Sequence, residues 1–345
     1  MDGKIAAGEK PFNLERSRRD FLKDATTVVA GLAAPKALGA EPANSLPTVS
    51  LGLHRVSRLI VGSNPIYGYS HFNPQYDMHM LEWFTDERII KLLLDCEKAG
   101  INTWQASFHR NMRRQFPKLR GAGCNIQFIC LAWPYDEKAD GWTGHTPEEV
   151  LEGTIRCAQA ASEFKPIGIA FHGFATDLLY RAGKIDLLKT YIDRVHDLGT
   201  TAGISTHNPK ILTTLDEEGL GNDFYMAGLH YISRHPEEWM KEIGTLPLDE
   251  GWIAADRPRM AEAVRKVSKP TLVYKVLGAG RKCDSEEQKR EAIAWAYKNI
   301  KPIDATIIGL YPRYSDQVAE TVKMVRGCLV QRKVLASLPP LRSSP

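Results

Sequence analysis

The sequence lacks strong charge of either sign, closely spaced cysteines and a long apolar run. Its 345 residues include 45 basic and 41 acidic side chains, for a formal net charge of +4. So small an excess gives no reason to expect nucleic acid or an anionic membrane as a partner. The six cysteines form no C-x-x-C pair and mostly fall in apolar patterns, which predicts free, structural thiols. The apolar run over residues 25–34 is short and rich in Ala and Gly, so no permanent membrane span is expected.

A twin arginine stands in front of that apolar run. Residues 17–23 read SRRDFLK, and Lys36 follows the run. This order is typical of a twin-arginine export signal, which we place at residues 1–40 with cleavage near residues 40–43. The interpretation predicts a bacterial protein that is periplasmic or otherwise exported, with the twin-arginine translocase as its partner during export. That route carries folded proteins, often with a cofactor already bound. The alternative is an amphipathic cytosolic N-terminus with an accidental Arg-Arg pair.

Strand-like and helix-like segments alternate along the rest of the chain. A linker rich in Pro, Ser and Asn covers residues 41–50. Eight apolar strands are predicted at residues 59–62, 101–105, 126–133, 167–172, 201–205, 224–230, 272–276 and 305–310. Alternation with helices over this length indicates a single (β/α)8 TIM barrel over residues 51–335, followed by a C-terminal tail at 336–345. An open doubly wound sheet is the alternative, but no Gly-x-Gly-x-x-Gly follows the first strand.

Capping residues mark where several helices begin. Apolar residues at helical spacing predict a helix over residues 85–98, which Ala99-Gly100 ends. Thr146 precedes Pro and two Glu, and Ser285 precedes two Glu. Both are the N-cap pattern, with acidic side chains in the first turn facing the helix dipole.

Five segments resemble the aldo/keto reductase family, in the expected order. They are residues 51–62, 98–106, 167–172 and 202–208, together with the stretches from 292–296 to 317–321 near the C-terminus. The resemblance covers most of residues 51–326. It implies a barrel that binds NADP and an oxidoreductase activity. It also implies that the cofactor is held by Ser205, Thr206, Gln317, Glu320 and Thr321.

The family's catalytic residues match this chain at one position. Family members reduce a carbonyl with a tyrosine acid that a lysine and an aspartate tune, while a histidine orients the substrate. His172 matches the histidine, and Gln105 occupies the aspartate position. The tyrosine falls near His109 or Arg110. The lysine falls at Ala132 or Trp133, and Thr206 replaces an asparagine that holds the nicotinamide. The tetrad is therefore degenerate.

Histidines gather at the predicted strand ends. His109, His172, His207 and His230 each follow a different strand, at the rim where a (β/α)8 barrel builds its site. Imidazole is a common ligand of divalent transition metals, so these four are a candidate metal set. The alternative for each is a polar rim residue that contacts substrate or caps a helix.

A lysine and several aromatic residues share this rim. Lys275 ends an apolar strand, where a lowered pKa suits a base or a Schiff-base nucleophile, or where it pairs with an acid. The loop over residues 64–73 is long and aromatic, and Trp133 and Trp142 add to it. Such a mouth suits a sugar-like small molecule. We list His172, His109, Gln105 and Lys275 as candidate catalytic residues.

Three functions fit these observations. The first is an exported aldo/keto-reductase-like oxidoreductase that acts on a carbonyl or sugar-like substrate and carries NADP tightly bound. The second is a metal-dependent hydrolase, lyase or isomerase of carbohydrates that uses the histidine cluster. The third is a non-catalytic binding protein. The cofactor segment near the C-terminus favours the first, and the missing tetrad residues favour the second.

Overall fold

The computed structural model describes residues 46–138, 141–248 and 250–337, with side chains described as far as residue 330. The predicted export signal at residues 1–40 lies outside the described residues, as does most of the C-terminal tail. No helix in the described part of the chain is long and apolar enough to cross a membrane.

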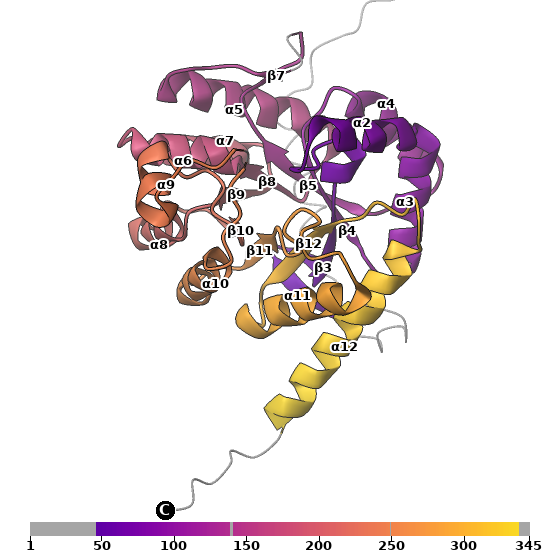
Figure 1. The fold of residues 1–345 in the computed structure, drawn as a ribbon. Helices are drawn as coiled ribbons and strands as arrows, with labels where there is room; N and C mark the ends of the chain where they lie inside the picture. Colours follow the sequence, from indigo (N-terminus) through magenta and orange to yellow (C-terminus); the bar gives the residue numbers. More distant parts are fainter. Residues whose placement is uncertain (1–45, 139–140, 249, 338–345) are drawn as a thin grey trace, which may run out of the picture. The chain divides into compact units, whose positions relative to one another are not determined.

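Eight parallel strands close into a barrel (Figure 1). Its strands are β3 (Leu59–Gly62), β4 (Thr103–Ser107), β5 (Gln127–Ala132), β8 (Gly168–Phe171), β9 (Thr201–Thr206), β10 (Phe224–Gly228), β11 (Thr271–Tyr274) and β12 (Ala305–Gly309). Neighbours pair in chain order, and β12 pairs with β3 to close the ring. Each of the eight predicted strands is present. The predicted (β/α)8 TIM barrel is confirmed.

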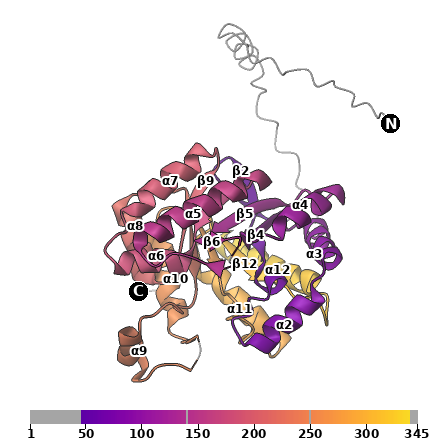
Figure 2. The same ribbon diagram turned by 90° about the horizontal axis from the view of Figure 1, so that it is seen from above.

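Helices surround the strands (Figure 2). They are α2 (Pro74–Trp83), α3 (Asp86–Lys98), α4 (Met112–Gly121), α5 (Pro147–Ala161), α6 (Gly173–Arg181), α7 (Leu187–Asp197), α8 (Pro209–Glu218), α9 (Pro236–Ile243), α10 (Asp256–Lys266), α11 (Glu286–Asn299) and α12 (Gln317–Ser337). Thr85, Thr146 and Ser285 cap α3, α5 and α11, each by accepting a backbone N–H. The helix starts predicted from these residues are confirmed.

The core has two layers, because the barrel strands are buried on both faces. One layer fills the space between strands and helices, and the other fills the barrel interior. In the interior, the Phe224 ring is fully buried beneath Gly168 and Gly203. A Cβ on Gly203 would lie 2.3 Å from the Phe224 ring, so the absence of a side chain on β9 makes room for the phenyl group of β10.

A hairpin lies where part of the linker was predicted. β1 (Thr48–Leu51) pairs antiparallel with β2 (His54–Ser57), and Leu46 ahead of them is 1% exposed. Residues 46–50 therefore belong to the folded unit. Leu51 packs with the interior residues of the barrel, and the Ser57 N–H donates to Asn102 at 2.7 Å, just before β4 begins. The hairpin thus lies at the end where the strands start, opposite the end that carries the site.

Candidate functional site

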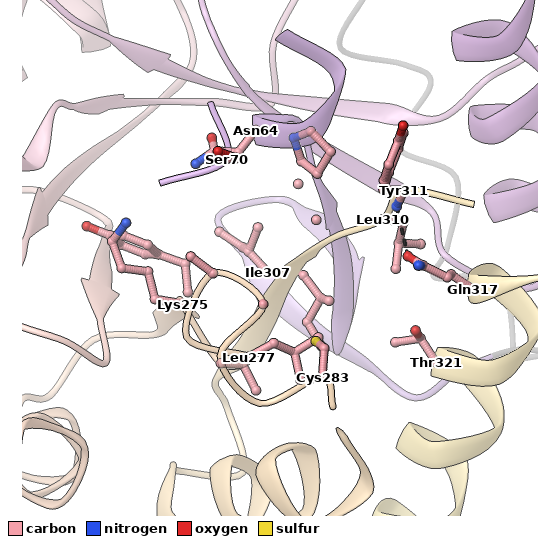
Figure 3. Close-up of a pocket in the computed structure, with 18 of the residues that line it drawn as sticks. Asn64, Ser70, Lys275, Leu277, Cys283, Ile307, Leu310, Tyr311, Gln317 and Thr321 are labelled. Atoms are coloured by element: carbon pink, nitrogen blue, oxygen red, sulfur yellow. Dashed lines mark hydrogen bonds between the residues drawn. The ribbon is translucent and has the colours of Figure 1, made fainter. Parts of the chain in front are cut away.

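Two adjoining cavities lie at the carboxyl ends of the barrel strands. The first, of about 300 Å³, runs from the mouth of the barrel past β11 and β12 to the start of α12. We call it the outer cleft. Figure 3 shows Lys275 at one end of it and Gln317 and Thr321 at the other, with Ile307 between. The second, of about 400 Å³, is the mouth cavity, lined by Ser107, Leu131, Trp133, Trp142, His172, Phe174 and His207 among others.

The two cavities meet at a shared set of side chains. Both are lined by Asn64, Tyr69, His71, Gln105, Tyr274 and Lys275. Polar groups therefore concentrate at the junction, while apolar and aromatic side chains form much of the remaining wall. This is the usual composition of a small-molecule site, in which a few polar groups orient a ligand that apolar walls enclose.

At the junction, Lys275, His71 and Glu250 form a chain of contacts that we call the lysine relay. Lys275 Nζ lies 3.3 Å from His71 Nε2, and His71 Nδ1 lies 2.7 Å from Glu250 Oε1. The carboxylate can only accept, so Nδ1 carries the proton and Nε2 is the acceptor that faces the amine. Three loops supply these residues: the loop after β3, the loop before α10 and the loop after β11.

The surroundings of the lysine relay lower the pKa of all three of its groups. Burial lowers the pKa of Lys275 to about 8, although the Glu250 carboxylate opposes that shift. Burial and the nearby Lys275 lower the pKa of His71. Burial by itself would raise the pKa of Glu250, but the hydrogen bond from His71 and the positive charges of His71, Lys275 and His207 together outweigh it, and the pKa falls.

Trp252 and Arg281 cover the lysine relay. Lys275 Nζ lies 5.3 Å from the centre of the Trp252 ring, and the Arg281 guanidinium lies 4.5 Å from it. Arg281 also donates a hydrogen bond of 3.0 Å to the backbone carbonyl of His71. Two cations contact one aromatic ring, which compensates partly for the loss of water around each of them.

A second polar unit, His207 with Asp177, faces the mouth cavity. Asp177 of α6 is fully buried and lies 3.4 Å from His207 Nδ1. Its carboxylate also accepts hydrogen bonds from Thr206 at 2.5 Å and from Ser233. Burial lowers the pKa of His207 while Asp177 opposes the shift. Asp177 therefore fixes the orientation of a buried imidazole at the cavity wall.

His172 stands beside this unit as a neutral imidazole. It is the N-cap of α6, and its Nδ1 accepts the Phe174 N–H at 3.3 Å. Burial, His207 and Lys275 together lower the pKa of His172 to about 3. With Nδ1 an acceptor, Nε2 carries the hydrogen. His172 can therefore donate a hydrogen bond to a carbonyl oxygen without adding charge.

Comparisons with solved structures identify the architecture. Two solved structures of a putative aldo-keto reductase from Pseudomonas aeruginosa superpose with a TM-score of 0.53 at 16% identity. They cover 82% and 84% of this chain and 94% and 100% of their own. The chain shares the fold of the aldo-keto reductases. No protein-family model matches the sequence, and no curated protein matches it.

Within this aldo-keto-reductase-like barrel, the residues predicted to hold the cofactor divide into two groups. Gln317, Glu320 and Thr321 line the outer cleft. Ser205 and Thr206 instead stand behind the site, because Ser205 Oγ contacts the Tyr274 hydroxyl at 3.1 Å and Thr206 binds Asp177. Among the predicted catalytic residues, Gln105 and Lys275 lie at the junction and His172 in the mouth cavity.

The four-histidine metal site is a prediction that the structure corrects. Among the described residues, no group of three or more His, Cys, Asp or Glu side chains is placed to hold a metal ion. His172 and His207 immediately follow their strands and line the mouth cavity. His109 and His230 come two residues after theirs, and side chains one position further along point to a different side. His109 stacks on Tyr67 at 4.9 Å, and His230 packs on Trp252 at 4.9 Å.

Because His109 lines neither the outer cleft nor the mouth cavity, it is no longer a candidate catalytic residue. It lines a separate cavity of about 570 Å³ between the starts of α3 and α4, with Arg110 and Arg114.

Sequence reasoning missed four residues of the site: Tyr274, His71, Glu250 and Asp177. Tyr274 had a usable signal, since it directly precedes Lys275 on the same strand end. Glu250 and Asp177 lie in a loop and a helix far along the chain, and only the folded structure shows what they contact.

Proposed function

We propose that this protein is an exported oxidoreductase of aldo/keto-reductase type, acting on a carbonyl group of a sugar-like molecule. The observation that carries the proposal is the junction of the outer cleft and the mouth cavity at Tyr274 and Lys275. The outer cleft, which extends from Lys275 to Thr321, suits a dinucleotide, and the aromatic mouth cavity beside it suits the substrate. The fold likeness supports the choice of reaction class.

The residues of the outer cleft fit a nicotinamide dinucleotide. Tyr274 offers an aromatic face at the junction, and its hydroxyl is held by Ser205 at 3.1 Å. Gln317 and Thr321 offer polar groups at the far end, and Lys289 offers a cation. When bound, the dinucleotide supplies the hydride. Lys289 is paired with Glu320 at 3.2 Å, so the positive charge at the α12 end is half neutralised.

The chain's own residues would manage the substrate and the proton. His172 Nε2 is positioned to donate a hydrogen bond to the carbonyl oxygen in the mouth cavity. Lys275 holds a proton at Nζ near neutral pH and delivers it as negative charge develops on that oxygen. The lysine relay thereby replaces the missing tyrosine as the acid. Trp133 and Trp142 flank the cavity with the aromatic surface that suits the apolar faces of a sugar.

A fluorescence titration with NADPH tests the proposal. The protein contains tryptophans at the mouth cavity, so binding should quench their emission and excite the nicotinamide. Tyr274→Ala removes the aromatic face and should weaken binding about tenfold. Tyr274→Phe is the matched control, since it keeps the ring and loses only the hydroxyl contact.

The outcomes separate the candidate functions. Saturable NADPH binding with turnover of hydroxyaldehydes supports the proposal. Binding of sugars without any dinucleotide binding would favour a non-catalytic binding protein. Equal effects of Tyr274→Ala and Tyr274→Phe would show that the ring does not contact the ligand and would overturn the placement of the dinucleotide.

A further inference from the structure

We propose that the Lys275 amine forms an imine with the carbonyl carbon of a small hydroxyaldehyde or hydroxyketone bound in the mouth cavity. This activity needs no dinucleotide. It rests on the carbonyl substrate class of the proposed function, and on nothing else in that proposal.

The amine lies at the wall of both cavities with an acceptor and no direct counter-ion. Lys275 lines the outer cleft and the mouth cavity. Its hydrogen-bond partner is His71 Nε2 at 3.3 Å, and within the described residues no carboxylate forms an ion pair with it. The nearest acid, Glu250, contacts the far side of the His71 ring. A lysine held for charge pairing would instead contact the carboxylate itself.

The backbone on both sides of this contact is strained. Lys275 has φ of 60° and His71 has φ of 54°, both in the left-handed region although neither is glycine. Such a conformation is unfavourable for any residue that carries a Cβ. The two residues come from loops 204 positions apart, and they meet through their side chains. Strain at both partners of one contact is typical of a site that the surrounding structure holds in place for function.

The chemistry balances with the groups present. The lone pair of neutral Lys275 Nζ attacks the carbonyl carbon, and the π electrons move to oxygen. His71 Nε2 takes the proton that the nitrogen loses, and His172 donates a hydrogen bond to the oxygen. That proton passes from His71 to the negative oxygen, which gives the carbinolamine. The nitrogen lone pair then expels hydroxide, which takes the second nitrogen proton through His71 and leaves as water. The product is the imine and one water, with no change in oxidation state.

Several charged and titratable groups face the amine and set the pH at which it reacts. Burial lowers the pKa of Lys275 to about 8, Glu250 raises it and Arg281 lowers it. The buried imidazoles of His71, His172, His207 and His230 also face it. Removing the Glu250 charge should therefore lower the pH at which imine formation is half maximal. Removing the Arg281 charge should raise that pH.

Borohydride trapping with glyceraldehyde as the probe tests the proposal. The purified full chain, without dinucleotide, is incubated with glyceraldehyde and reduced with sodium borohydride. Peptide mapping by mass spectrometry should find the adduct at Lys275, with an added mass equal to the aldehyde less its oxygen. Exposed Lys91 and Lys266 report the background reaction of surface amines. Modification of Lys275 should exceed theirs at least tenfold at pH 7.

Variants then test the mechanism. Lys275→Met should abolish the site-specific adduct, while Lys266→Met should leave it unchanged. Glu250→Gln should shift the pH midpoint down and Arg281→Met should shift it up. Since mapping of the unmodified sequence gives an answer by itself, the test stands even if a variant fails to fold.

Two results would overturn the proposal. One is an adduct spread over exposed lysines with Lys275 unmodified. The other is an adduct at Lys275 whose pH midpoint stays unchanged in both Glu250→Gln and Arg281→Met. Neither result depends on the NADPH titration, so a failure here is distinguishable from a failure of the proposed function.

Discussion

At the scale of single residues, His230 is an imidazole that burial keeps uncharged. The residue is 5% exposed, and its ring packs on Trp252. Burial lowers its pKa to about 4, with Asp256 opposing. The unfolded chain holds this proton up to a pH near 6.5. The stabilising effect of His230 is therefore full above pH 6.5 and is lost as the pH falls toward 4.

We predict that His230→Phe reduces the sensitivity of the fold to acid. The phenyl ring keeps the packing on Trp252 and cannot bind a proton. Between pH 7.5 and pH 5 the natural residue should lose about 2 kcal/mol of stability that the variant does not lose. Urea unfolding at both pH values measures this difference. Exposed His54→Phe is the control, and an equal slope in His54→Phe and His230→Phe would contradict the prediction.

Glu320 is the residue expected to govern which dinucleotide is preferred. It is the acid that pairs with Lys289 at the far end of the outer cleft, where the resemblance places the adenine end of the cofactor. Glu320→Gln removes a negative charge and releases Lys289, so NADPH binding should tighten about threefold relative to NADH. Paired fluorescence titrations at low salt measure the ratio. An unchanged ratio would place the 2′-phosphate elsewhere.

At the scale of elements, the neighbouring strands β9 and β10 pack closely because one contributes a glycine where the other contributes a phenyl ring. Gly203 of β9 leaves space for the fully buried Phe224 ring of β10. We predict that Gly203→Ala costs about 1–3 kcal/mol, since its Cβ would overlap a ring that cannot move. Phe224→Leu opens a cavity and also destabilises the fold. Because the smaller side chain accommodates the new methyl group, the double variant should be at least about 1 kcal/mol more stable than the sum of the single effects predicts.

Chemical denaturation of the two single variants and the double variant measures that coupling. Gly327→Ala in α12 is the control, because nothing lies within 4 Å of the added methyl group. It should be neutral or stabilise by up to about 1 kcal/mol. Additive effects of Gly203→Ala and Phe224→Leu would mean that the two residues are not in contact in solution.

The strands were predictable because burial on both faces leaves continuous apolar runs, such as the one that became β5. The caps were predictable because Thr85 or Ser285 acts within one turn of its own helix. The start of the hairpin at β1 was not, since that strand has four residues and three of them fall in the segment rich in Pro, Ser and Asn. The sequence thus predicts an element well where one local feature, such as a continuous apolar run or an N-cap residue, determines it.

At the scale of the whole molecule, the site depends on loops that the sequence cannot bring together. The position of Lys275 at a strand end predicts that it lies at the barrel rim. That His71 and Glu250 contact it depends on how the loops after β3 and before α10 fold over one another. The direction of each rim histidine likewise depends on whether it follows its strand by one residue or two. The order of the strands and the position of these residues at the barrel rim were therefore predictable, and the directions of their side chains were not.

The export proposal also concerns the molecule as a whole, because the twin-arginine route would require the barrel to fold before it crosses the membrane. We predict that Arg18→Lys with Arg19→Lys blocks export in a bacterial host that has the twin-arginine translocase. The substitution keeps both charges, so an N-terminus that acts only through its basic character would be unaffected. Fractionation should find the natural sequence in the periplasm, shortened by about 40 residues, and the variant uncleaved in the cytoplasm. Lys10→Arg, outside the motif, should still be exported. Export of the double-lysine variant would show that the arginine pair carries no signal.

The exported protein should also retain its dinucleotide, because free dinucleotide is scarce outside the cytoplasm. Gel filtration of the periplasmic protein should recover a ratio near one dinucleotide per chain. Loss of the dinucleotide would contradict the proposed reductase activity and leave the Lys275 amine as the reacting group.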